Sequence, residues 1–166
     1  MVATTDVGRR DRLWPAHYAV FGTNPLSVAY GASGIAVFLH DVLGELPAGV
    51  RAWMLDHEVT AEDYPPGLLV GAAGIAHAFW RVGLHDRAEE VMAACYRSPL
   101  LFDDPTLFLG VSGWGLASLD LYHATGRQEY LDRAAQAADH LLRTAKEEAG
   151  TLYWHRANEE QVNHGY

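Results

Sequence analysis

One unit of sequence occurs three times in this chain at nearly constant spacing. The copies read SVAYGASGIAVFLH at 27–40, GLLVGAAGIAHAFWRVG at 67–83 and TLFLGVSGWGLASLDLYH at 106–123. Each has an apolar lead-in, then Gly-x-x-Gly, then an apolar run, and the leading glycines are 40 and 39 residues apart. A period in this range is typical of folds that use one supersecondary unit repeatedly. The repeat therefore restricts the fold more than any other feature of the sequence.

Each apolar run predicts a helix that is buried on most sides, beginning near Gly31, Gly71 or Gly110. An amphipathic helix is predicted after each one, over 49–59, 85–97 and 127–149. Paired helices, one apolar and one charged on one side, predict an all-α fold. We expect a partial α/α toroid in which parallel inner helices converge on a centre and antiparallel outer helices shield them.

The predicted domain organisation follows the repeat. Residues 1–26 are expected to form an irregular N-terminal strap whose Trp14, Tyr18 and Phe21 pack on the first repeat. The rest is expected to be one domain, in these parts: repeats near 27–59, 67–97 and 106–149, a short extended or turn segment at 152–154, a polar loop from 155, and the start of a fourth repeat at 163–166.

Composition excludes several classes of function. The net charge of −9 and the absence of a basic stripe argue against partners such as nucleic acid or an anionic membrane. The single cysteine, Cys95, cannot form an intrachain disulfide and is expected to be buried. The N-terminal charges precede no apolar signal region, and no window approaches the length of a membrane span. We therefore expect a cytoplasmic protein.

The repeated glycines have two interpretations, both of which the sequence leaves open. Glycine lets helices approach closely and lets the backbone turn sharply. Alternatively, unpaired N–H groups in the first helical turn favour an anion. The glycines concerned are Gly31, Gly34, Gly71, Gly74, Gly110 and Gly113.

The repeated motif, its period and the closing Asn163-His164-Gly165-Tyr166 resemble the lanthionine synthetase C-like (LanC-like) cyclases. The similarity covers about 26–166 and is greatest to the cyclase portion of class III and IV kinase–cyclase lanthipeptide synthetases. It implies a toroid of seven inner and seven outer helices that adds cysteine thiols of a precursor peptide to dehydroalanine or dehydrobutyrine. The implied partners are that peptide and a kinase domain or the remaining C-terminal half.

The sequence departs from the family pattern in its catalytic parts. Many relatives bind zinc through two cysteines and a histidine of later repeats, and those segments are absent here, so we expect no metal and no cofactor in this chain. The family's acid/base histidine would fall beyond Tyr166, and His164 does not inherit its role. We therefore expect no catalytic residue within the chain, which reads as the N-terminal part of a cyclase, inactive alone.

Six residues are candidates for contact with a substrate. Thr106 stands where some relatives carry an acid, with Asp104 nearby, although a solvated loop or a helix N-cap is the alternative for Asp104. Trp114 replaces an aliphatic residue after Gly113, and a core aromatic is the alternative there. His77 lies inside the second apolar run, where a hydrogen-bonded core histidine is the alternative. The set is Tyr30, His77, Asp104, Thr106, Trp114 and His164.

Two other functions fit the same helical pattern. One is a non-catalytic peptide-binding or scaffolding module on the same toroid. The other is a carbohydrate-active α/α barrel, which needs a pair of carboxylates that only Asp103 and Asp104 offer. In each case three repeats form an open arc, so some of Val37, Phe38, Leu116 and Leu119 should be exposed, favouring self-association or marginal stability.

Overall fold

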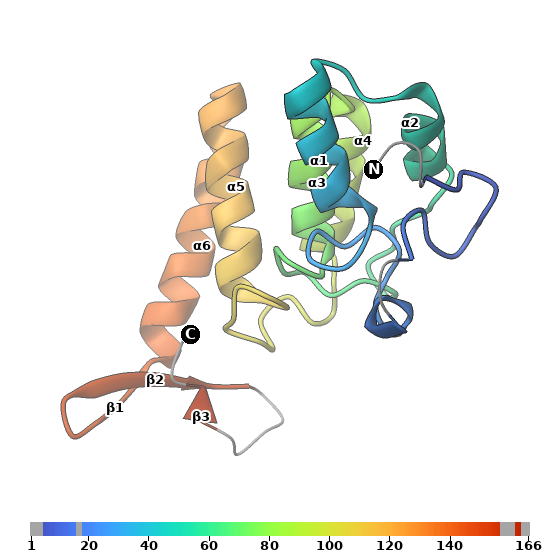
Figure 1. The fold of residues 1–166 in the computed structure, drawn as a ribbon. Helices are drawn as coiled ribbons and strands as arrows, with labels where there is room; N and C mark the ends of the chain where they lie inside the picture. The colour runs from blue at the N-terminus through green and yellow to red at the C-terminus, as the bar shows by residue number, and fades with distance from the viewer. Residues whose placement is uncertain (1–4, 16–17, 157–161, 164–166) are drawn as a thin grey trace.

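The structure is a computed structural model that describes residues 5–15, 18–156 and 162–163, and its fold is mainly helical (Figure 1). The helices are α1 (Ala32–Leu43), α2 (Ala48–Leu55), α3 (Ala72–Arg81), α4 (His85–Tyr96), α5 (Val111–Thr125) and α6 (Gln128–Thr144). A 3₁₀ helix, Tyr18–Gly22, precedes them, and three short strands follow: β1 (Lys146–Glu148), β2 (Thr151–His155) and β3 (Val162–Asn163). None of the described helices has the length and apolarity to cross a bilayer.

The three inner helices begin where the repeat predicts. Gly31, Gly71 and Gly110 are the N-cap residues of α1, α3 and α5. The helices run in the same direction in Figure 1, and α3 packs against both α1 and α5. The parallel order of these helices is therefore confirmed.

The outer helices pair with inner ones in the second and third repeats. In Figure 1, α4 runs back along α3, and α6 runs back along α5, with close packing within each pair. In the first repeat α2 is eight residues long and stands apart from α1. The predicted antiparallel pairing therefore holds for two repeats and is looser in the first.

The hydrophobic core is continuous and is centred on α3. Phe79 and Ile75 of this helix are fully buried, and the largest core side chains around them come from every repeat. Cys95 on α4 is also buried, as predicted, and burial raises the pKa of its thiol to about 12. It is therefore a packing residue, and its neutral thiol is a poor nucleophile.

Main-chain hydrogen bonds join the lead-in loops of neighbouring repeats. The N–H of Ala29 donates to the carbonyl of Leu69 at 2.9 Å. The N–H of Leu68 then donates to the carbonyl of Leu107, also at 2.9 Å, and Gly67 donates to Leu109 at 2.8 Å. The loops thus form a row along one end of the inner helices.

The C-terminal region differs from the sequence prediction. The helix expected over 127–149 ends at Thr144, and the chain then forms a hairpin in which Glu148 pairs with Thr151. Ala149 and Gly150 between them have φ of 52° and 78°, which is the geometry of a two-residue hairpin turn. The residues expected to extend the helix therefore form β1, and the extended segment at 152–154 lies within β2.

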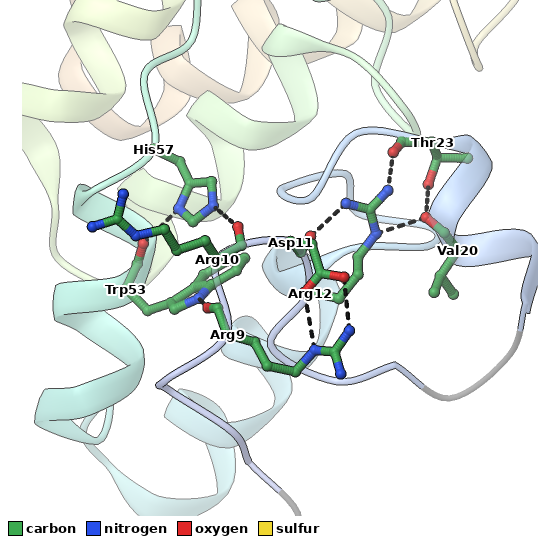
Figure 2. Close-up of polar contacts among 8 residues, drawn as sticks. All are labelled: Arg9, Arg10, Asp11, Arg12, Val20, Thr23, Trp53 and His57. Atoms are coloured by element: carbon green, nitrogen blue, oxygen red, sulfur yellow. Dashed lines mark hydrogen bonds and ion pairs between the residues drawn. The ribbon is translucent and has the colours of Figure 1, made fainter.

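The N-terminal strap is held differently from the prediction. Tyr18 and Phe21 are 82% and 51% exposed, so neither is buried against the first repeat as predicted. Trp14 does pack on the core, as predicted, and Leu13 beside it is fully buried. The strap is also closed by Arg12, whose buried guanidinium donates to backbone carbonyls further along the strap (Figure 2).

The two ends of the helical row expose apolar side chains. Phe38 on α1 is 51% exposed and Leu116 on α5 is 43% exposed, as expected for an open arc, whereas Val37 and Leu119 are partly covered. Leu142 on α6 is 75% exposed. Among the described residues, no repeat precedes α1 to cover it, and none follows α5 and α6.

Candidate functional site

The first backbone N–H groups of the inner helices are bonded to the loops that precede them. In each repeat the residue after the leading glycine donates to a carbonyl six residues before that glycine. The bonds are Ala32 to Pro25 at 2.9 Å, Ala72 to Pro65 at 2.8 Å and Val111 to Asp104 at 2.7 Å. Because these donors are already satisfied, the geometry favours the packing interpretation of the glycines over anion binding.

Close backbone contact explains why glycine occupies the motif. A Cβ on Gly74 would lie 1.6 Å from the carbonyl oxygen of Leu68, and one on Gly110 would lie 1.7 Å from that of Asp104. The other four motif glycines would place a Cβ 2.5 Å or less from a backbone atom. Each lead-in loop therefore lies directly on the first turn of its own helix, where no side chain fits.

Asp104 and Thr106, two of the predicted site residues, are brought together as part of this loop. One Asp104 oxygen accepts from the Thr106 N–H at 2.7 Å and from its hydroxyl at 2.5 Å. The other oxygen pairs with Arg156 at 2.5 Å. Because these contacts occupy both carboxylate oxygens, Asp104 stabilises the loop. It therefore does not support the pair of free carboxylates that a carbohydrate-active site requires.

Trp114 is a core residue in this structure. Its side chain is fully buried, and its indole N–H donates to the carbonyl of Leu101 at 2.8 Å. The rings of Tyr96 and Phe102 pack edge-on against it, at 6.1 and 5.6 Å between centroids. The ring is thus surrounded by protein and offers no accessible surface to a ligand.

His77 lies on the exposed side of the inner helices. Its Nδ1 is 3.5 Å from a carboxylate oxygen of Asp120 on α5, and its side chain is about one-third exposed. Burial lowers the pKa of His77, and Arg81 acts in the same direction, while Asp120 opposes both. A neutral imidazole beside a carboxylate can accept a proton, which is the chemistry of a general base.

An ion pair extends this arrangement to α1. The Arg81 guanidinium donates to Asp41 at 2.9 Å, so side chains of α1, α3 and α5 meet across one exposed face. We call Asp41, His77, Arg81 and Asp120 the inner-helix strip. Asp41, Arg81 and Asp120 each lie ten residues after the leading glycine of their repeat.

The sequence analysis missed three of these four residues, although a signal for them was present. Equal offsets from an equal motif place residues on the same side of equivalent helices. When the copies are aligned by Gly31, Gly71 and Gly110, the position ten residues later is charged in all three. That position contains Asp41, Arg81 and Asp120, the three residues missed.

The remaining candidates are not joined to the strip by any contact described. Tyr30 lies in the first lead-in loop, where it is 47% exposed and its N–H donates to the Ser27 hydroxyl at 3.2 Å. His164 and the rest of the expected fourth-repeat start beyond Asn163 lie outside the described residues. Neither residue adds geometry to the site.

No protein-family model matches this chain, and no curated protein matches it. Among the described residues, no group of three or more His, Cys, Asp or Glu side chains is placed to hold a metal ion.

Proposed function

We propose that this chain forms an arc of a LanC-like toroid and takes part in thioether ring formation in a dehydrated peptide. The observation that carries this proposal is the stacking of three Gly-x-x-Gly repeats in sequence order. Their glycine-capped inner helices run parallel, and antiparallel outer helices cover the second and third. The three repeats would supply one part of the wall of a central cavity.

The inner-helix strip gives that wall its chemistry. A peptide lying on it would meet the Arg81 guanidinium, which binds carboxylates and carbonyls, and the imidazole of His77. In thiol addition, a base takes the cysteine proton, sulfur bonds to the β-carbon of dehydroalanine, and the α-carbon accepts a proton. His77 beside Asp120 is the described group best placed to exchange such a proton.

Zinc does not fit the residues present. The only cysteine is buried, and its Sγ donates to the carbonyl of Pro66 at 3.4 Å. No metal-holding group occurs among the described residues. We therefore assign no step of the reaction to a metal held by this chain. The sequence alone predicted no catalytic residue here, whereas the position of His77 beside Asp120 leads us to propose that the chain contributes proton transfer as well as peptide binding.

Binding and chemistry can be tested separately with one synthetic probe. The probe is a short fluorescein-labelled peptide that carries one dehydroalanine and one cysteine. Fluorescence anisotropy measures its binding, and thiol alkylation followed by mass spectrometry measures ring formation. We expect saturable binding that weakens about tenfold in Arg81→Ala, since a charge-assisted contact is lost. Arg143→Ala, on the exposed side of α6, is the matched control and should bind normally.

The outcomes distinguish the candidate functions. Ring formation above the rate in buffer, reduced in His77→Gln, supports a cyclase. Binding that depends on Arg81 without ring formation supports a peptide-binding module that requires further repeats for chemistry. Absence of binding, or equal binding by both arginine variants, would refute the proposed site.

A further inference from the structure

A histidine at the end of α2 lies against the strap. His57 follows Asp56, the C-cap residue of α2, and its ring lies between the helix and the strap (Figure 2). Its Nδ1 is 2.8 Å from the carbonyl oxygen of Trp53, and its Nε2 is 2.9 Å from that of Arg10. Both ring nitrogens are thus within hydrogen-bond distance of backbone carbonyls that belong to different segments.

The two carbonyls restrict the protonation state that suits this contact. A carbonyl oxygen only accepts, whereas a neutral imidazole has one N–H donor and one acceptor nitrogen. Only the doubly protonated ring can donate to both oxygens, and a neutral ring leaves a nitrogen lone pair facing an oxygen. We propose that His57 is a protonation-dependent latch that holds the strap on α2 in the imidazolium form and loosens it when neutral.

The end of α2 favours the same form. The carbonyl of Trp53 lies in the last turn of the helix, where carbonyls lack partners within the helix and carry partial negative charge. A cation at this position is stabilised by the helix dipole. The Trp53 ring lies 3.9 Å from the His57 ring between centroids, so a charged imidazole would also gain a contact with the indole.

Charged groups around the latch act in both directions. Arg9 and Arg10 come from the strap, and Arg87 of α4 donates to the His57 carbonyl at 3.2 Å. These cations oppose a charged ring, although Arg9 is paired with Asp11, and Arg87 with Glu90. Two carboxylates favour the charged ring. Asp56 lines the same surface pocket as His57, and Glu58 is its neighbour in sequence. The charged groups thus act in opposite directions, whereas both carbonyl contacts, at 2.8 and 2.9 Å, favour the charged ring.

Release of the latch would uncover part of the core. Leu13 is 1% exposed and is carried by the strap directly after the latch contact. Besides His57, Trp53 holds this segment, since its indole N–H donates to the carbonyl of Arg9 at 2.5 Å. Trp53 and His57 therefore both attach the strap to α2, and of these two side chains only His57 can bind a further proton.

Hydrogen–deuterium exchange of strap peptides tests the latch in the intact chain. Protection of residues 5–13, corrected for intrinsic exchange, should be about tenfold higher near pH 5.5 than near pH 8. His57→Gln should abolish this difference and resemble the parent near pH 8. Trp53→Phe should lower protection at both pH values while retaining the difference. His123→Gln, which replaces an exposed histidine on α5, is the control and should behave as the parent.

Two results would overturn the latch. One is protection of the strap that does not change with pH in the parent chain, or that changes equally in His57→Gln. The other comes from nitrogen-15 NMR of the ring, which does not depend on a variant that folds. A His57 ring with a single N–H near pH 5.5, in a chain whose strap is protected, contradicts the geometry. Neither result depends on whether the protein acts on peptides.

Discussion

The inner helices α3 and α1 carry the same motif but differ in burial. Seven of the ten residues of α3 are buried, against four of the twelve in α1. Phe38 of α1 and Ala78 of α3 stand at the same place in the repeat, yet Phe38 is 51% exposed and Ala78 is 1% exposed. The difference arises because α3 has an inner helix on each side. Burial in this fold is therefore set by the neighbours of a repeat as much as by its own sequence.

The largest expected effect is that of Gly74→Ala in the central repeat. The new methyl group would overlap the Leu68 carbonyl at 1.6 Å and would also press on Val28 of the first repeat at 3.0 Å. Because the main overlap is with backbone, we expect the free energy of unfolding to fall by more than about 4 kcal/mol. Urea denaturation followed by circular dichroism measures this change. Gly22→Ala, where a Cβ meets nothing within 4 Å, should be tolerated.

Next in size is the contrast between two phenylalanines. Phe79→Ala removes a fully buried ring from α3 and should cost about 3–5 kcal/mol of stability. Phe38→Ala on the edge helix should cost less than about 1 kcal/mol, since half of that ring is exposed. Equal losses in urea melts would show that α1 is covered in solution. Sedimentation of the parent and of Phe38→Ala then tests whether that cover is a second copy.

A hydrogen bond between repeats should have an intermediate effect. The Tyr96 hydroxyl of α4 bonds the buried Ser118 hydroxyl of α5 at 2.8 Å. Tyr96→Phe should lower the free energy of unfolding by about 1 kcal/mol. The exposed Asp41–Arg81 pair between the first and second repeats should contribute less, about 0.5 kcal/mol, which Arg81→Met measures in the same assay. A larger loss in Arg81→Met would reverse this ranking of the two inter-repeat contacts.

The smallest effect is the pH dependence that His77 gives to α3. Burial lowers the pKa of His77 in the folded state. The unfolded chain therefore binds this proton more readily than the folded chain as the pH falls through about 6.5, the ordinary pKa of histidine. This part of the stability is therefore present at neutral pH and is lost on acidification. In thermal melts from about pH 7 to about pH 5, His77→Gln should lose less stability than the parent. The same slope in both chains would contradict it.

Sequence alone predicted the helical repeat because the signal is local. The glycines mark the helix starts, since a lead-in loop that lies on its own first turn leaves no room for a Cβ. The position of α4 and the burial of Cys95 followed from helical periodicity in the same way.

What sequence reasoning missed depends on long-range contacts or on weak turn signals. The hairpin after α6 turns at Ala149-Gly150, whereas its residues Lys146, Glu147 and Glu148 favour continued helix. The ion pair of Asp41 with Arg81 joins residues forty positions apart, and it forms because their helices run parallel in register. The burial of Trp114 agrees with its interpretation as a core aromatic, but the rings of Tyr96 and Phe102 that cover it come from α4 and the loop after α4, which local sequence does not show.

The row of lead-in loops has a consequence for how such a chain can change. Ala29 and Leu68 reach the next repeat through backbone N–H groups, which any residue other than proline can supply. Gly67 is the exception, because a Cβ there would lie 2.1 Å from the carbonyl oxygen of Phe108. Apart from that glycine, these backbone bonds between units depend little on side-chain identity. Units joined in this way can be duplicated or exchanged, and their exposed face can change, while the connection between them stays the same. Arrays of this kind can therefore evolve by recombination and can be engineered unit by unit.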